Sequence, residues 1–121
     1  MGRYAFGRKL GLMAAKTYPR QGEVWWVNLD PTIGKEISKK RPCLIVSPDD
    51  MNAHLGTVIA APITSTLRSW PTRITIKLQR QNSSIALDQV RMIDNTRLVK
   101  KMTAIDAEPA LDVLREMFAK A

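Results

Sequence analysis

Short apolar runs separated by turn residues occupy most of the chain and predict a series of β-strands. Glu23–Leu29 is rich in β-branched and aromatic residues and is bounded by turn residues on both sides. Continuous apolar runs at Pro42–Ser47 and Thr57–Ile63 are typical of strands buried on both faces. Pro42 fits only at the start of its strand, because proline cannot donate to a sheet ladder.

The alternation of apolar and polar residues predicts further strands after Trp70. Arg73–Leu78 places its isoleucines and Leu78 on one face and its polar residues on the other. Ser84–Ile93 is predicted as one longer strand, and another begins at Leu98. Few segments between these strands are long enough for a parallel crossover, so an antiparallel sheet curled into a small barrel is expected.

The period of the pattern becomes helical near the C-terminus. Asp106 is the predicted N-cap, and Glu108 and Pro109 suit a first helical turn. Apolar residues then share one face at helical spacing: Ala110, Leu111, Leu114, Met117 and Phe118. A second, short helix is expected at about Asp49–His54. The fold class is therefore mainly β with a C-terminal helix.

The charge is unevenly distributed along the 121 residues, whose net charge is +8. The first 20 residues hold five basic residues and no acidic one, so the rest of the chain is only mildly basic. We divide the chain into a basic tail, 1–18, and one domain, 19–121. The tail is expected to be mobile, or a short helix without a core. One cysteine and only a short apolar patch in the tail favour a cytoplasmic protein that contacts no membrane.

The polar loop from Asp30 to Arg41 is the first candidate for function, because connections of this length are often functional. The guanidinium of Arg41 has the charge and the planar set of donors that suit a phosphate. In the alternative interpretation, the lysines only keep the loop soluble, and Arg41 pairs with Glu36 or Asp88.

Two further polar groups follow or interrupt predicted strands. Three hydroxyls, Thr64, Ser65 and Thr66, come directly after a buried run and can bind phosphate oxygens, with Arg68 and Trp70 nearby for charge and base stacking. The alternative is an ordinary hydroxyl-rich turn with Trp70 packed on the barrel. Asp88 and Gln89 are placed in the middle of the long strand, where a satisfied polar pair is an equally good interpretation.

Several common chemistries lack their residues in this sequence. His54 is the single histidine and Cys43 the single cysteine, which leaves a zinc site without enough ligands. No glycine-rich phosphate loop is present. We therefore expect neither a metal nor a cofactor.

The chain resembles the MazF/PemK family of toxin endoribonucleases. The resemblance rests on GEVWWVNLDPTIGKE (22–36), KRPCLIVSP (40–48), APITS (61–65) and ALDQVRMID (86–94). It implies an SH3-like β-barrel of the MazF/PemK/CcdB type, working as a homodimer, that cleaves single-stranded RNA without a metal. It also implies a cognate antitoxin partner.

The resemblance and the loop chemistry together give the candidate site. The resemblance implies catalytic roles for Arg41 and Thr64 and places Glu36 near the site as a candidate general base. The expected RNA-binding residues are Lys39, Lys40, Ser65, Thr66, Arg68 and Gln89. Some PemK-type members carry a catalytic arginine two residues before the Asp-Gln pair, whereas this chain has Ala86 there. Asp88 is therefore expected to be structural or to contact RNA.

Two other functions remain open from the sequence. A CcdB-like toxin has the same barrel but binds DNA gyrase and cleaves nothing; Arg41 and Thr64 would then be replaceable. A plain RNA-binding domain would depend on stacking by Trp25, Trp26 and Trp70, and its binding would survive Arg41→Ala with only a modest loss.

Overall fold

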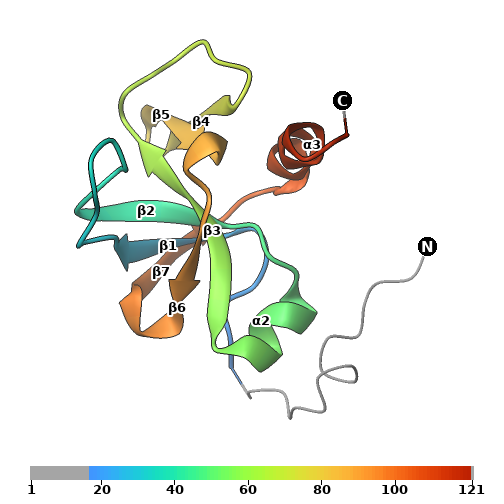
Figure 1. Ribbon diagram of the computed structural model, residues 1–121. Helices are drawn as coiled ribbons and strands as arrows, with labels where there is room; N and C mark the ends of the chain where they lie inside the picture. Colours follow the sequence, from blue (N-terminus) through green and yellow to red (C-terminus); the bar gives the residue numbers. More distant parts are fainter. Residues whose placement is uncertain (1–16, 121) are drawn as a thin grey trace.

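The computed structural model describes residues 17–120 (Figure 1). The strands are β1 (Glu23–Asn28), β2 (Lys40–Ile45), β3 (Thr57–Thr64), β4 (Arg73–Leu78), β5 (Gln81–Ala86), β6 (Arg91–Asp94) and β7 (Leu98–Ala104). The helices are α2 (Asp49–Leu55) and α3 (Glu108–Met117), with short 3₁₀ turns η1 (Leu87–Gln89) and η2 (Asn95–Arg97). The predicted short helix, the strand from Leu98 and the C-terminal helix are thus confirmed.

All the strands of the described chain join one antiparallel sheet in the order β4-β5-β3-β2-β1-β7, with β6 paired to β3. The sheet curls around the long strand β3, and α3 lies to one side of it (Figure 1). The prediction of a mainly β fold with a curled antiparallel sheet and a C-terminal helix is therefore confirmed.

Strands β2 and β3 are buried on both faces, as their unbroken apolar runs predict. In β2, Leu44 belongs to a cluster that α3 helps to cover, whereas Cys43 and Ile45 belong to a second cluster on the opposite face. In β3, Ala61 and Ile63 join the first cluster, and Val58 and Ala60 join the second. Because side chains alternate along a strand, one run of sequence fills both cores.

Strand β2 begins two residues earlier than predicted, so the prediction that Pro42 starts it is wrong. The pairing with β1 extends to Asn28 opposite Lys40, and Pro42 lies opposite Trp26. The ladder with β3 begins only at Cys43, one residue after the proline. Pro42 is tolerated inside the strand because the β3 ladder, which its missing N–H could have interrupted, has not yet begun.

The prediction of one strand over Ser84–Ile93 is also wrong, because η1 divides it into β5 and β6. Both strands pair with β3, β5 at Ile63 and Thr64 and β6 from Thr57 to Ala60. The break falls opposite Ala61 and Pro62, and Pro62 has no N–H to offer a ladder. Asp88 and Gln89 consequently lie in a 3₁₀ turn and not in mid-strand.

Helix α3 begins one residue later than its predicted cap implies. The N-cap is Ala107, yet the Asp106 carboxylate still accepts a hydrogen bond from the Glu108 amide at 3.0 Å. Ala110 is fully packed against the sheet. Met117 and Phe118 were predicted on this apolar face, but at the end of the helix they are exposed.

The first residues of the described chain are fixed to α2. The Asn52 side chain donates to the Pro19 carbonyl at 3.0 Å, and the Gln21 amide donates to Asp49 at 2.7 Å. The predicted tail, 1–18, lies outside the described residues except for Thr17 and Tyr18. No helix within 17–120 is long and apolar enough to cross a membrane.

Candidate nucleic-acid interface

A groove of about 560 Å³ opens where the β1–β2 loop, the β3–β4 loop and η1 meet. Its lining combines cations, hydroxyls and two carboxylates with apolar surface that includes Ile37 and Trp70. The lining residues are Lys35, Glu36, Ile37, Ser38, Arg41, Thr64, Thr66, Arg68, Trp70, Arg73, Asp88 and Gln89. A groove that combines arginines and hydroxyls with an aromatic ring is the kind of surface that RNA binds through its phosphates and bases.

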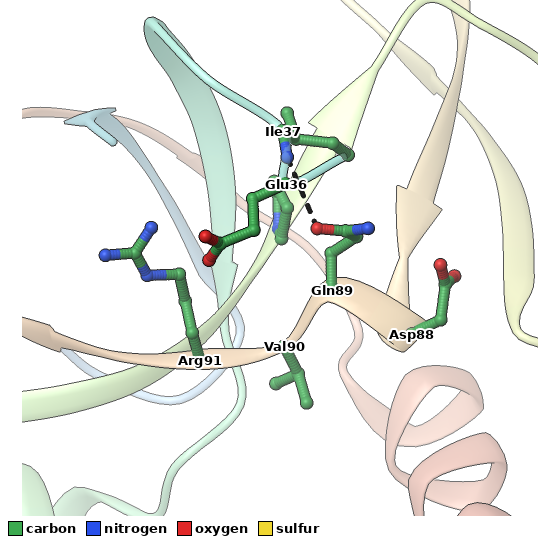
Figure 2. Close-up of a pocket in the computed structure, with 7 residues that line it drawn as sticks. Glu36, Ile37, Asp88, Gln89, Val90 and Arg91 are labelled. Atoms are coloured by element: carbon green, nitrogen blue, oxygen red, sulfur yellow. Dashed lines mark hydrogen bonds between the residues drawn. The ribbon is translucent and has the colours of Figure 1, made fainter. Parts of the chain in front are cut away.

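The β1–β2 loop that forms one wall of the groove is held at its base and near its end. At the base, the Leu29 amide donates to the Lys39 carbonyl at 2.9 Å, and the Lys39 amide donates to Asp30 at 2.8 Å. Near the end, the Ile37 amide donates to the side-chain oxygen of Gln89 at 3.3 Å (Figure 2). Gln89 therefore holds the loop beside η1, a role that sequence reasoning did not assign to it.

Arg41 enters the groove from β2 and is oriented by the loop. Its Nε donates to the Ser38 carbonyl at 3.0 Å. Among residues 17–120, no carboxylate lies within ion-pair distance of Arg41. The predicted alternative, a pair with Glu36 or Asp88, is therefore wrong. One edge of the guanidinium is fixed, and its terminal NH₂ groups remain available to an anionic ligand.

Thr64 ends β3 at the floor of the groove, where it is only 8% exposed. Its hydroxyl oxygen accepts a hydrogen bond from the Thr66 amide at 3.2 Å. This contact uses one of the two lone pairs of Thr64 Oγ1 and leaves the hydroxyl proton free to be donated. The groove thus brings together a cation from β2 and a hydroxyl donor from β3.

Arg73 and Asp88 form an ion pair on the opposite wall. Arg73 Nε and Nη2 lie 2.6 and 3.0 Å from the two oxygens of Asp88, and the Thr72 hydroxyl donates to the same carboxylate. The hydrogen bond from Arg73 is the largest cause of a lowered pKa at Asp88, and it outweighs the opposing effect of burial. Asp88 is thus ionised and holds Arg73 in place. This agrees with the first of its two predicted roles, the structural one.

Trp70 lies beside this ion pair and is 49% exposed. The guanidinium of Arg73 lies 4.7 Å from the centre of its ring, and that of Arg68 lies 5.2 Å from it. These cation–π contacts connect Asp88, through Arg73 and Trp70, to Arg68 on the exposed loop. Trp70 thus packs on β4 through Arg73, as the alternative interpretation expects, and half of its surface remains exposed for a ligand.

Glu36 borders both the groove and a smaller pocket of about 290 Å³ that is also lined by Gln89 and Arg91. One carboxylate oxygen accepts from the Ile33 amide at 2.9 Å, within the loop. The Glu36 carboxylate points toward the guanidinium of Arg91 (Figure 2). Arg91 is a cation near the site that sequence reasoning missed.

The structure brings six of the nine predicted site residues to the groove lining, namely Glu36, Arg41, Thr64, Thr66, Arg68 and Gln89. Lys39, Lys40 and Ser65 are exposed but do not line it. Sequence reasoning missed Arg73, because strand alternation assigned it to a polar face without showing what that face meets. The signal available in the sequence was the position of Arg73 close to Trp70, whose ring can contact a guanidinium.

The single cysteine and the single histidine lie outside the groove lining. Burial raises the pKa of the Cys43 thiol to about 12, so that no thiolate is available at neutral pH. His54 is on α2, where its Nδ1 lies 2.8 Å from the Asp50 carbonyl. Within residues 17–120, no group of three or more His, Cys, Asp or Glu side chains is arranged to hold a metal ion.

Residues 20–117 match the family model of the PemK-like, MazF-like toxins of type II toxin–antitoxin systems. The chain is 35% identical over 95 residues to the endoribonuclease EndoA of Bacillus subtilis, which covers 74% of this chain and 82% of that protein. It is 30% identical over 81 residues to the endoribonuclease toxin MazF of Escherichia coli, covering 67% of this chain and 73% of the relative.

Solved structures of the same kind share the fold. MazF from Deinococcus radiodurans superposes with a TM-score of 0.73 at 25% identity and covers 84% of this chain and 94% of its own. A MazE–MazF complex from the same organism contains a chain with a TM-score of 0.66 at 26% identity, covering 84% and 93%.

Proposed function

The chain belongs to the PemK-like, MazF-like toxin family of type II toxin–antitoxin systems, and from this premise we propose that it is an endoribonuclease that cleaves single-stranded RNA without a metal ion. The names of its relatives, EndoA and MazF endoribonucleases, support the activity. The observation that carries the proposal is that one groove holds the Thr64 hydroxyl and Arg41, which has no carboxylate partner among residues 17–120.

RNA supplies its own nucleophile in this reaction. The ribose 2′-oxygen attacks the adjacent phosphorus and loses its proton, while the bond to the 5′-oxygen breaks and this oxygen takes up a proton from solvent water. The products are a 2′,3′-cyclic phosphate and a 5′-hydroxyl end. The protein therefore needs to position the phosphate and stabilise the negative charge that develops on it.

Arg41 and Thr64 have complementary roles in this mechanism. The terminal NH₂ groups of Arg41 bind the phosphate as a fixed cation and hydrogen-bond the leaving 5′-oxygen. The Thr64 hydroxyl donates to a non-bridging oxygen, while the Thr66 amide occupies one of its two lone pairs. Glu36, which lines the same groove, is the candidate base for the 2′-hydroxyl proton.

The remaining candidate residues bind the RNA outside the reacting phosphate. Thr66, Arg68 and Gln89 line the groove and can contact neighbouring phosphates or bases. Lys39, Lys40 and Ser65 lie outside it and add charge or hydrogen bonds along an extended strand. Arg73, held by Asp88, fixes the wall on which Arg68 and Trp70 lie.

We further propose that the protein is a cytoplasmic homodimer neutralised by a cognate antitoxin. Solved relatives include a MazE–MazF complex, which supports the antitoxin partner. Large exposed apolar side chains, among them Met92, Val99 and Phe118, offer surface for a second subunit or for the antitoxin.

Cleavage of a long single-stranded RNA in the presence of EDTA tests the proposed activity. We expect defined fragments with 5′-hydroxyl ends and cyclic or 3′-phosphate ends, and no stimulation by divalent ions. Loss of cleavage in EDTA, restored by a divalent ion, would contradict the mechanism. Binding without cleavage would identify an RNA-binding domain, and binding to DNA gyrase alone would identify a CcdB-like toxin.

A further inference from the structure

Ser84 is a fully buried hydroxyl that no part of the mechanism above uses. It lies on β5 with 0% exposure, and its Oγ has no hydrogen-bond partner among the described protein atoms. A buried hydroxyl without a partner costs stability, so its presence calls for a physical explanation.

The register of the sheet places Ser84 directly beside Thr64, which lines the groove. Ser84 is paired with Thr64 of β3, and the next pair, Ile63 with Ile85, faces the hydrophobic core. Ser84 and Thr64 therefore share the opposite face, because directly opposed residues in a sheet project to the same side. Thr64 lines the groove, and Ser84 lies beside it on the neighbouring strand without lining the groove itself.

The distance between two such residues suits a hydrogen bond. Directly opposed residues have Cβ atoms about 4.5–5.5 Å apart, a separation that rotation about χ1 can close between two hydroxyls. One lone pair of Thr64 Oγ1 is already taken by the Thr66 amide. A proton donated by Ser84 would occupy the second lone pair, after which Thr64 could act only as a donor.

We propose that Ser84 is a positioning residue for Thr64: when RNA is bound, its buried hydroxyl donates to Thr64 Oγ1 and directs the threonine proton to a non-bridging phosphate oxygen. This inference rests on the proposed endoribonuclease function. Hydrogen bonds in series polarise one another, so the contact also makes Thr64 a stronger donor as charge develops on the phosphate.

Single-turnover cleavage at saturating protein, together with thermal unfolding, tests the role of Ser84. Ser84→Ala should lower the cleavage rate about tenfold, less than the hundredfold or more expected when a donor to the developing charge is itself removed. RNA affinity should not change. The unfolding temperature should stay level or rise, because the variant removes a buried hydroxyl that has no partner.

Ser83→Ala is the matched control. Ser83 is the neighbouring serine of β5 and is also buried, but it is paired with Ile76 and projects to the other face of the sheet. This variant should leave the cleavage rate unchanged. A loss of rate in Ser84→Ala that is accompanied by an equal loss in Ser83→Ala, or by a lowered unfolding temperature, would overturn the proposal in favour of a packing role.

A double-mutant cycle shows whether Ser84 acts through Thr64. Ser84→Ala should still slow cleavage in a Thr64→Ser background, which keeps the hydroxyl. It should have no effect in a Thr64→Val background. If Thr64→Val leaves no measurable rate, a phosphorothioate at the non-bridging oxygen replaces it, since sulfur is the weaker acceptor and should shrink the Ser84→Ala effect.

The failure of this inference differs from the failure of the proposed function. A chain that cleaves RNA and depends on Arg41 and Thr64, but is indifferent to Ser84→Ala, refutes the positioning role alone. A chain that cleaves no RNA refutes the proposed function and with it this inference.

Discussion

The two walls of the groove each carry an arginine, and the two arginines are held in different ways. Arg73 is 7% exposed at its side chain and is bound through two of its nitrogens to the Asp88 carboxylate. Within residues 17–120, the side chain of Arg41 makes a single hydrogen bond, from its Nε to the Ser38 carbonyl. A carbonyl orients a guanidinium but does not balance its charge. A carboxylate orients the guanidinium and also balances its charge.

This difference separates an arginine that supports the groove from one that can act on a ligand. The charge of Arg73 is balanced before any RNA binds, and its guanidinium is committed to Asp88 and to the ring of Trp70. Arg41 is already oriented and retains its full charge, so little reorganisation is needed when a phosphate arrives. Among the residues that the structure describes, this contrast makes Arg41 the better candidate for catalysis.

Arg41→Ala should have the largest effect on cleavage. The loss of an electrostatic donor that acts on developing charge costs about 3 kcal/mol, or a hundredfold or more in rate. RNA affinity and the unfolding temperature should change much less, because a group that acts on the transition state affects the rate. Arg41→Lys should restore only part of the rate, since an ammonium lacks the planar set of donors. Single-turnover cleavage and RNA affinity measured on the same variants give the comparison.

Asp88→Ala should affect stability more than chemistry. It leaves the poorly exposed guanidinium of Arg73 without its partner, which we expect to cost about 2 kcal/mol in the free energy of unfolding. Denaturant unfolding measures this loss. Asp112→Ala is the control, because the ion pair of Asp112 with Arg115 is exposed on α3 and should contribute little. If Asp88→Ala lowered cleavage as much as Arg41→Ala and left stability unchanged, the structural role assigned to the Arg73–Asp88 pair would be wrong.

The same ion pair predicts a dependence of stability on pH. The pKa of Asp88 is lowered in the folded state. Its contribution to the free energy of unfolding is therefore present above the unfolded pKa of about 3.9 and is lost as the pH falls toward the folded pKa. Wild type should therefore lose stability in this acidic range more steeply than Asp88→Ala. Denaturant unfolding of both proteins between about pH 2 and pH 6 measures the difference.

The sequence predicts the interior of this fold better than its groove. Cys43, Leu44 and Ile45 are consecutive apolar residues, and burial on both faces follows from that fact alone. The division of Ser84–Ile93 into two strands could not be predicted from the residues of this segment, because the break is caused by the partner strand β3. Pro62 interrupts the ladder of β3, and only the pairing shows which segment lies opposite.

The site was predicted in part for a similar reason. Arg41 and Thr64 stand at strand ends, where a resemblance to a family can be applied residue by residue. The Arg73–Asp88 pair joins residues 15 positions apart, through a hairpin and a turn that the sequence does not orient. The hydroxyl of Ser84 belongs to an apparently ordinary strand segment and becomes a candidate only when its register with Thr64 is known.

Removal of residues 1–16 should weaken RNA binding without changing the site. The segment carries Arg3, Arg8, Lys9 and Lys16. Its loss should lower RNA affinity about threefold to tenfold at low salt and flatten the salt dependence, because fewer counterions are released. The cleavage pattern and the unfolding temperature should stay the same, and the remaining salt dependence then reports the charges of the groove together with nearby surface lysines such as Lys39 and Lys40. A truncated chain that does not fold would show that the segment is structural.

Lys40→Ala should have the smallest effect, although Lys40 adjoins Arg41 in the sequence. The two residues are neighbours on β2 and project to opposite faces, and only Arg41 lines the groove. Lys40 should therefore act as a surface charge whose contribution to affinity is small at low salt and disappears at high salt. Lys39→Ala, at the exposed end of the loop, is expected to behave in the same way. Affinity and single-turnover rate at two salt concentrations measure both variants beside Arg41→Ala. If all three variants showed equal, salt-sensitive losses of affinity and unchanged cleavage rates, Arg41 would act only as a surface charge of the loop. The distinction between Arg41 and Arg73 would then be wrong.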